Sequence, residues 1–390
     1  MSDRPLLMIP GPIEISPAVC EAAGGPPPGH LSPAIMEAFG RALAAMRQVW
    51  RASADSQPFI LPGSGTLAME SAVQNLVDAG DRVVLVNTGY FSDRMGEMLR
   101  RRGADLVDLK AEPGCVPDQD EVEAALAGGP TKALFATHVD TSTAVRTDAR
   151  ALAAAARRHG TLSIFDGVCA TAAERFEMES WGADVYLTAS QKAIGLPAGL
   201  ALLVAGPGAL RAFESLKTRP AMTLDWQAWI PVMRAYEEGR PAYFATPPTN
   251  LVRALDVGLA EILAQGADVR TAMDACFAAH ERTAAALRGV WKTLGLHALP
   301  ARPELAANTL SALRYPKGMG PEVVAAIGKR GVIVAGGLHQ ALAKTYFRVG
   351  HMGWVITQPD QLARTVSAVA AGVGGDEAAA LATLRAGLAG

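Results

Sequence analysis

Short apolar runs alternate with helix-like stretches through the first half of this chain, and this alternation constrains the fold most. The apolar runs occupy 59–61, 82–87, 105–109, 133–137, 161–165, 184–188 and 200–204. The stretches between them predict helices over 66–79, 92–102, 119–127 and 148–158. Continuously apolar strands separated by helices are typical of a mostly parallel sheet that is buried on both faces. We therefore expect an α/β fold with a mostly parallel seven-stranded sheet, and ligands at the carboxyl ends of its strands.

The pattern changes at both ends of this region. Beyond about residue 250, apolar residues recur at helical spacing in one long segment, namely Val269, Met273, Cys276, Leu287 and Trp291. Mixed helical and strand-like pieces follow, with apolar runs at 331–335 and 345–349. Residues 1–35 are rich in Pro and Gly, which indicates an extended arm. We expect an N-terminal arm over 1–35, a large domain over 36–262 and a smaller C-terminal α+β domain over 263–390.

The net charge, the spacing of the cysteines and the lengths of the apolar runs argue against several classes of protein. The chain has 390 residues, a formal net charge of −2 and no Lys/Arg run, so we expect no nucleic-acid partner. Its four cysteines lie far apart without a CxxC pair, which argues against a disulfide framework and a structural zinc site. No apolar run reaches the roughly 18–20 residues of a membrane span, and prolines bound the short apolar stretch near the N-terminus. We expect a cytoplasmic enzyme that acts on small molecules, with no membrane partner and no bound metal ion.

A Gly-rich turn, Pro62-Gly63-Ser64-Gly65-Thr66, follows the first apolar run and precedes a predicted helix. Free N–H groups at a helix N-terminus suit a phosphate, and the hydroxyls of Ser64 and Thr66 add donors. The string over 63–68 also fits the GxGxxA pattern of dinucleotide-binding folds, so the turn alone leaves both cofactors and an ordinary tight turn open. A nicotinamide dehydrogenase is less well supported, because the next run, 82–87, ends without the acid that would bind a ribose.

Three further clusters follow later strands: Asp166, the string Ser190-Gln191-Lys192, and the hydroxyl-rich segment 137–143. Taken singly, they read as a helix cap, a solvated lysine and a turn. Together with the Gly-rich turn, they match what pyridoxal 5′-phosphate (PLP) requires. A lysine must form a Schiff base, an acid must face the ring nitrogen, and a helix N-terminus must hold the phosphate. The order of turn, acid and lysine, with Lys192 lying 26 residues after Asp166, is that of fold-type I PLP enzymes.

The chain resembles the class V aminotransferases, in particular the branch of alanine–glyoxylate, serine–glyoxylate and serine–pyruvate aminotransferases. The resemblance covers nearly the whole length. Its motifs, in order, are PGP at 10–12, GHLSP at 29–33, SGTLAMESA from Ser64, THVDTSTAV from Thr137, FDGV from Phe165, ASQKAIGLPAG from Ala189, YFATP from Tyr243 and RVGHMG from Arg348. The resemblance implies a fold-type I architecture. It also implies transfer of an amino group from a small amino acid of the alanine or serine type to glyoxylate or pyruvate.

The same resemblance implies roles for the residues around the cofactor ring. Lys192 would carry PLP as a Schiff base and would also move the α-proton of the substrate. Asp166 would pair with the ring nitrogen, and these two are the expected catalytic residues. Val168 would pack beneath the ring, Phe91 would stack on it, and Ser142 (or Thr141) would lie near its phenolic oxygen.

For the phosphate and the substrate, the resemblance implies a site that is shared between two copies of the chain. The expected phosphate ligands within one copy are Ser64, Gly65, Thr66 and Gln191. Tyr243 and Thr246 would reach the phosphate from the neighbouring subunit of a homodimer. Arg348 would bind the substrate carboxylate with a two-point fork, which guanidinium geometry favours.

The sequence departs from the family at a few positions, which leaves the choice of substrate open. Ala144 stands where relatives have Gly, Ala198 where they have Pro, and 169–173 replaces a Ser-rich stretch that ends in Gly-Gly. A pyridoxamine–pyruvate aminotransferase is an alternative, although the intact Ser64-Gly65-Thr66 string favours a phosphorylated cofactor. A cysteine desulfurase is disfavoured, because the last cysteine, Cys276, falls within a predicted helix rather than a loop.

Overall fold

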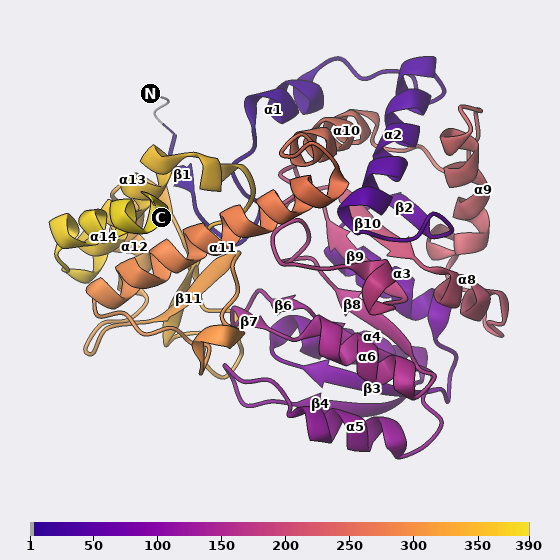
Figure 1. Ribbon diagram of the computed structural model, residues 1–390, viewed down its shortest axis with the longest axis horizontal. Coiled ribbons are helices and arrows are strands. Elements are labelled where there is room, and N and C mark those ends of the chain that lie inside the picture. Colours follow the sequence, from indigo (N-terminus) through magenta and orange to yellow (C-terminus); the bar gives the residue numbers. More distant parts are fainter. Residues whose placement is uncertain (1–3, 390) are drawn as a thin grey trace.

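The computed structural model describes residues 4–389, so residues 1–3 of the expected arm and residue 390 of the expected C-terminal domain lie outside it. Its centre is a seven-stranded sheet with strand order β2-β10-β9-β8-β5-β3-β4 (Figure 1). The strands are β2 (Gln57–Pro62), β3 (Arg82–Asn87), β4 (Asp105–Lys110), β5 (Ala133–Thr137), β8 (Leu162–Asp166), β9 (Val185–Ala189) and β10 (Leu200–Ala205). Neighbouring strands are parallel except at β10, which runs antiparallel to β2 and β9. The predicted mostly parallel seven-stranded sheet is confirmed.

The helices predicted between these strands form close to the expected bounds. They are α3 (Gly65–Leu76), α4 (Tyr90–Arg102), α5 (Gln119–Ala127) and α6 (Ala149–Arg158). Local signals explain their ends: Asp118 and Glu121 form a capping box at the start of α5, and Gly103 ends α4 with a φ of 86°. A small hairpin of β6 (Val139–Asp140) and β7 (Val145–Arg146) follows β5, and the short helix α7 (Met178–Trp181) precedes β9.

The N-terminal segment is more helical than expected. It contains β1 (Leu6–Leu7), α1 (Pro17–Gly24) and the start of α2 (Pro33–Val49), so the prediction of an extended arm is wrong for residues 17–24 and 33–35. The Ser16 side chain accepts a hydrogen bond from the N–H of Val19 at 3.2 Å and so caps α1. Pro17 is tolerated in the first helical turn, where its missing N–H would have no helical partner. Helix α1 packs against α10 (Thr249–Leu263), a distant contact that the Pro/Gly-rich local sequence conceals.

The segment between β10 and α10 holds α8 (Pro207–Glu214), the short 3₁₀ helix η1 (Met222–Leu224) and α9 (Trp226–Glu237). Helix α8 packs against β10, and α9 and α2 pack against β2. The strands of the sheet are almost completely buried, apart from β4 at one edge. This burial on both faces explains the continuously apolar runs in the sequence.

The C-terminal part forms a second layer of helices over a small antiparallel sheet of order β11-β14-β13. Its elements are α11 (Val269–Thr293), η2 (Pro303–Leu305), β11 (Leu310–Arg314), α12 (Glu322–Gly328), β12 (Val332–Ile333), β13 (Ala335–Gly336), β14 (Tyr346–Gly350), η3 (Gly353–Thr357), α13 (Pro359–Val373) and α14 (Glu377–Ala389). Helix α11 joins two hydrophobic cores. Its Met273 and Phe277 lie in the core of the large sheet, whereas Leu287 and Trp291 lie in the C-terminal core. Within residues 4–389, no helix is long and apolar enough to cross a lipid bilayer.

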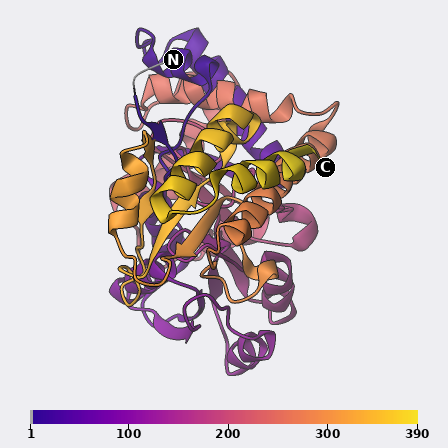
Figure 2. The ribbon, with the colours of Figure 1, turned by 90° about the vertical axis from the view of Figure 1, so that its left-hand side faces the viewer.

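The beginning of the chain is tied to this C-terminal part. Strand β1 pairs in parallel with β12, and the N–H of Gly350 donates to the carbonyl oxygen of Met8 at 2.7 Å. Figure 2 shows the N-terminal segment beside the C-terminal helices, which lie at the front of that view. Residues 9–12 are therefore held between the two cores.

Candidate active site

Asp166 and Lys192 are brought together by neighbouring parallel strands. Asp166 is the last residue of β8, and Lys192 lies just beyond the end of β9, which pairs with β8. Because the carboxyl ends of parallel strands meet at one edge of a sheet, the two side chains share that edge. Both are buried, with 2% of Asp166 and 7% of Lys192 exposed. The structure thus joins the acid and the amine that the sequence singled out.

One carboxyl oxygen of Asp166 is held by the backbone. Its Oδ1 accepts a hydrogen bond from the N–H of Val168 at 2.9 Å, and Oδ2 has no hydrogen-bond partner within residues 4–389. Burial raises the pKa of Asp166 to about 7, and the negative charge of Asp140 adds to this effect. A protonated ring nitrogen at Oδ2 would instead favour the ionised carboxylate. The site therefore fits the ring nitrogen of PLP.

The Lys192 side chain lies under the N-terminal segment. Its Nζ donates a hydrogen bond to the carbonyl oxygen of Pro10. At Gly11, where φ is +97°, an added Cβ would lie 2.7 Å from Cδ of Lys192, so only glycine fits this position. Burial lowers the pKa of Lys192, and the charge of Arg348 lowers it further, although acidic neighbours act in the opposite direction. A lowered pKa leaves more neutral amine, which a nucleophilic lysine needs.

The turn after β2 leaves the N-terminus of α3 open. Ser64 is the N-cap of α3, but its hydroxyl makes no capping bond and stays free for another partner. Gly65 is buried, and an added Cβ would lie 2.8 Å from Cγ2 of Val168, so glycine allows α3 to approach the end of β8 closely. Oε1 of Gln191 is buried and has no hydrogen-bond partner among the described residues 4–389. Since the two ends of an amide are assigned from their partners, this end can equally present its NH₂ donors to a phosphate.

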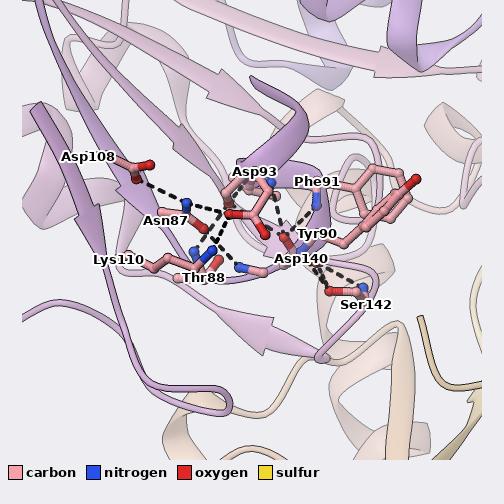
Figure 3. A network of polar contacts seen from close by, with 12 residues as sticks. Asn87, Thr88, Tyr90, Phe91, Asp93, Asp108, Lys110, Asp140 and Ser142 are labelled. Atoms are coloured by element: carbon pink, nitrogen blue, oxygen red, sulfur yellow. Dashed lines mark hydrogen bonds and ion pairs between the residues drawn. The ribbon is translucent and has the colours of Figure 1, made fainter. Parts of the chain in front are cut away.

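A buried carboxylate, Asp140, organises the start of α4 (Figure 3). Its Oδ2 accepts hydrogen bonds from the N–H groups of Phe91 and Ser92 at 3.1 and 3.3 Å. Its Oδ1 accepts from the N–H of Ser142 at 2.9 Å, and the Ser142 hydroxyl accepts from the N–H of Tyr90 at 3.0 Å. This network fixes the predicted residues Phe91 and Ser142 next to each other.

Arg348 reaches the site from β14 and is buried, with 9% exposed. Its Nε donates to the carbonyl oxygen of Gly336 at 2.9 Å, and its Nη1 donates to the carbonyl oxygen of Thr141 at 3.1 Å. No carboxylate within residues 4–389 forms an ion pair with it, so part of its donor fork remains available. A buried guanidinium in this state suits a substrate carboxylate.

Tyr346 holds the loop that leads into β14. Its hydroxyl accepts hydrogen bonds from the N–H groups of Leu338 and His339 at 3.0 and 2.9 Å, and it donates to the carbonyl oxygen of Ser142. Tyr346 and Arg348 thus fasten the loop over 336–345 to the hydroxyl-rich turn of the large sheet.

Within residues 4–389, no hydrogen bond joins Tyr243 or Thr246 to Lys192. Their hydroxyls lie 3.2 Å apart, and 58% of Tyr243 is exposed. The ring of His30 lies beside Tyr243, with 5.3 Å between the ring centroids. Among residues 4–389, no hydrogen bond connects this pair to the other predicted phosphate ligands.

Two departures from the family acquire a structural meaning. Ala144 has a φ of 60° and Ala172 a φ of 62°, so both adopt the left-handed conformation that favours glycine. The resemblance implied glycine at Ala144 and a Gly-Gly pair at 172–173. The chain therefore has alanine in a conformation that favours glycine, at two positions where the resemblance implied glycine.

Sequence reasoning missed three residues that shape the site, namely Arg94, Asp140 and Tyr346. Asp140 carried a signal, because it lies in the segment just after β5 that was already singled out. Arg94 donates from Nη1 to Oγ1 of Thr66 at 2.8 Å, and Tyr346 acts on backbone groups far away in sequence. Neither residue belongs to a local pattern that could have revealed it.

The alternative reading of the Gly-rich turn as a dinucleotide site does not agree with the topology. In that fold, the turn follows an interior strand of a parallel sheet. Here the turn follows β2, which lies at the edge of the sheet and pairs in antiparallel fashion with β10. The dehydrogenase interpretation is therefore wrong.

Comparison with known proteins agrees with this geometry. Residues 29–355 match the family model described as aminotransferase class-V. The chain is 37% identical to alanine–glyoxylate aminotransferase 1 of Saccharomyces cerevisiae, over 89% of this chain and 91% of the relative. It is 31% identical to L-aspartate–glyoxylate aminotransferase of Paracoccus denitrificans, over 90% of this chain and 87% of that protein. The solved structure of an alanine–glyoxylate aminotransferase from Nostoc sp. superposes with a TM-score of 0.83 at 28% identity, over 95% of this chain and 96% of that one. The chain belongs to the class V aminotransferases and is a PLP-dependent aminotransferase of fold type I.

Proposed function

We propose that the enzyme moves an amino group from a small amino acid of the alanine or serine type to a 2-oxo acid, glyoxylate or pyruvate. The observation that carries the proposal is the convergence of Lys192, Asp166 and Arg348 on one buried sheet edge. Both relatives named above take glyoxylate in their names, which supports this acceptor. Their names differ in the donor, alanine in one and aspartate in the other, so the donor is the less constrained partner.

We assign the binding of the cofactor to the residues at the strand ends. Ser64, Gly65, Thr66 and Gln191 would hold its phosphate, while Val168, Phe91, Ser142 and Asp166 would hold its ring. When bound, PLP accepts the amino group of the donor and passes it to the 2-oxo acid, because its ring withdraws electrons from the reacting carbon.

The residues of the chain would supply attachment, proton transfer and orientation. The buried amine of Lys192 would attach the cofactor and then, as a free base, move the proton of the substrate α-carbon. Asp166 would keep the ring nitrogen protonated by facing it with a carboxylate. Arg348 would orient the α-carboxylate by donating two parallel hydrogen bonds from the planar guanidinium.

We also propose that the enzyme is a homodimer with shared active sites. Tyr243 and Thr246 are held together on an exposed segment, and no hydrogen bond joins them to Lys192 of their own copy within residues 4–389, which suits residues that reach the site of a partner.

We further propose a cytoplasmic location and a division into domains. The four cysteines are free thiols, which supports a cytoplasmic location. The division into an arm (1–35), a large domain (36–262) and a small domain (263–390) is retained as a proposal, with α11 joining the two cores.

The test is a screen of amino donors against the PLP form of the purified enzyme, followed by absorbance. We expect alanine or serine to convert the PLP form to the pyridoxamine form, and glyoxylate or pyruvate to reverse the conversion. Pyridoxamine with pyruvate is included to test the alternative reaction. Lys192→Ala should abolish turnover, and borohydride reduction of the wild type followed by peptide mapping should label Lys192. Label on another lysine would contradict the assignment.

The shared site is tested by dilution. The double variant Tyr243→Phe, Thr246→Ala should bind PLP more weakly, and the loss of PLP from the wild type should follow dissociation of the dimer. Mass photometry and PLP fluorescence at matched concentrations check this. If a diluted monomer keeps its full PLP affinity, the two residues do not serve a partner's site.

A further inference from the structure

Arg94 occupies the space between the phosphate turn and the residues that surround the ring. It lies near the start of α4, and its Nη1 donates to Oγ1 of Thr66 at 2.8 Å. Its Nη2 donates to the hydroxyl of Tyr90 at 3.1 Å. The central guanidinium carbon lies 5.1 Å from the ring centroid of Tyr90 and 5.2 Å from that of Phe91. Two aromatic rings and two hydroxyls thus fix the position of this cation.

The charge of Arg94 has no acidic partner. No carboxylate forms an ion pair with it anywhere in the described range 4–389, although two other arginines of the same helix are paired. Arg100 pairs with Asp108 at 2.8 Å, and Arg101 pairs with Glu97 at 2.8 Å. A half-buried arginine that is held in place but left unpaired is suited to an anion that comes from outside the chain.

A cavity of about 460 Å³ between α3 and α4 adjoins Arg94 and Thr66. Glu70, Glu97 and Arg101 also line it, whereas Ser64, Gly65 and Gln191 do not, so the phosphate would lie at Thr66 rather than along this cavity. A guanidinium has five N–H donors, and only two of the Arg94 donors are used in the contacts above. Because the Thr66 oxygen accepts a hydrogen bond from Arg94, the Thr66 O–H remains free to donate in another direction. The pair therefore presents several donors at the N-terminus of α3.

The phosphate ligands assigned so far lack a positive charge. Ser64, Thr66 and Gln191 are neutral, as are Tyr243 and Thr246 of a partner. A phosphate monoester carries about 1.5 to 2 negative charges near neutral pH, and a helix N-terminus offsets only about half a charge. We infer that Arg94 is the cation of the phosphate subsite, where it binds the cofactor phosphate directly and orients the Thr66 hydroxyl toward it. This inference rests on the proposed mode of cofactor binding.

The test compares two aldehydes that differ only in the phosphate. Cofactor-free protein is titrated with PLP and with pyridoxal, and the dissociation constants are measured by absorbance. Arg94→Gln should weaken PLP binding by roughly tenfold to a hundredfold, as expected for hydrogen bonds to a charged group. Pyridoxal binding should change by less than about twofold, because the lost partner is the phosphate. Arg94→Lys should fall between the two, since it keeps the charge but loses the planar fork.

Arg101→Gln is the matched control. Arg101 lies two helical turns further along α4 and lines the same cavity, but it pairs with Glu97. Its loss removes the same charge and should leave both dissociation constants within about twofold, as for other exposed ion pairs. Inorganic phosphate gives a second readout that needs no aldehyde chemistry. It should compete with PLP for the wild type and compete less well for Arg94→Gln.

The outcomes separate this inference from the cofactor assignment. If Arg94→Gln weakens PLP and pyridoxal equally, Arg94 acts through the ring or through Asp166, and the phosphate role is wrong. If neither constant changes, or if Arg101→Gln weakens PLP as much, the inference is also overturned. If the wild type fails to bind PLP at all, the cofactor assignment itself fails.

Discussion

The two sides of the active site are built in different ways. The proposed cofactor side, defined here as Ser64–Thr66, Asp166 and Lys192, lies at the ends of strands of one sheet. The proposed substrate side, defined as Pro10–Gly11, the loop over 336–345 and Arg348, comes from both ends of the chain. Side chains on the cofactor side are placed by strand register. On the proposed substrate side, by contrast, the side chains of Arg348 and Tyr346 hold the loop over 336–345 and the turn at Thr141 and Ser142 together. They do so by hydrogen bonds to backbone carbonyl and N–H groups.

This difference teaches where the specificity of such an enzyme can change. A residue at the end of a buried strand cannot move without disturbing the packing of the sheet. The positions of the proposed cofactor-binding side chains are therefore strongly restrained. A loop that is held through its own backbone N–H and carbonyl groups can exchange its side chains without changing its backbone conformation. Substrate choice can therefore vary on one side while the cofactor side stays the same.

The largest expected effect separates chemistry from binding on the cofactor side. Asp166→Asn should still bind PLP, because Lys192 and the phosphate turn are unchanged. An amide cannot stabilise a protonated ring nitrogen as a carboxylate does, so the half-reaction with an amino acid should slow by orders of magnitude. Stopped-flow absorbance measures this rate. An unchanged rate would reduce Asp166 to a structural partner of the Val168 N–H.

Arg348→Lys addresses the substrate side. The charge remains but the two-point fork is lost, so the enzyme should lose about tenfold to a hundredfold in kcat/KM, equivalent to about 1.5–3 kcal/mol. PLP affinity should not change, because Arg348 touches none of the proposed phosphate ligands. Steady-state kinetics and PLP titration of the same preparation make the comparison. If the variant uses amino acids as well as the wild type, the carboxylate is bound elsewhere.

Tyr346→Phe should have a smaller effect that is confined to the substrate side. It leaves the N–H groups of Leu338 and His339 without their partner, at a cost of about 1–3 kcal/mol in unfolding free energy. The loosened loop should raise KM several-fold with little change in PLP affinity. Tyr315→Phe is the control, because the Tyr315 hydroxyl is buried and already lacks a partner. Equal effects of the two variants would show that the loop contacts of Tyr346 are unimportant.

A further effect is a pH dependence in the stability of the cofactor-free protein. The pKa of Asp166 rises from 3.8 to about 7 on folding, so between about pH 4 and 7 the folded chain holds a proton that the unfolded chain has lost. This contribution to stability is present at low pH and is lost as the pH rises, by at most about 1.4 kcal/mol per pH unit. The difference in melting temperature between wild type and Asp166→Asn, measured across this range, isolates the contribution from that of other groups. Loading with PLP should make this difference in melting temperature less dependent on pH. In the cofactor-free protein, a difference that does not vary with pH would contradict the raised pKa.

The same division explains what the sequence could predict. Asp166 and Lys192 directly follow apolar strands, so the strand pattern alone indicated that they would meet. Arg348 was assigned only by resemblance, because nothing in its own segment shows that it contacts Thr141. Helix α1 was missed, since its stability depends on packing against α10 more than 200 residues away rather than on its local sequence.

Arg94 and Tyr346 were invisible for a related reason. Arg94 donates to the side chain of Thr66 in another helix, which its own segment does not reveal. Tyr346 donates to the backbone carbonyl of Ser142, and such a bond leaves no trace in the residue type of the acceptor. Asp140 shows the intermediate case, because its position after β5 was noticed but its hydroxyl-rich neighbours suggested only a turn. Sequence patterns thus predict the frame of the site better than the contacts that complete it.

The pairing of β1 with β12 has a consequence for how the enzyme is made on the ribosome. Leu6 and Leu7 are synthesised more than 300 residues before their partners Val332 and Ile333. Strand β10, which completes the large sheet, is available long before that. The N-terminal segment that covers Lys192 can therefore pair with β12 only after the strands of the large sheet have been synthesised.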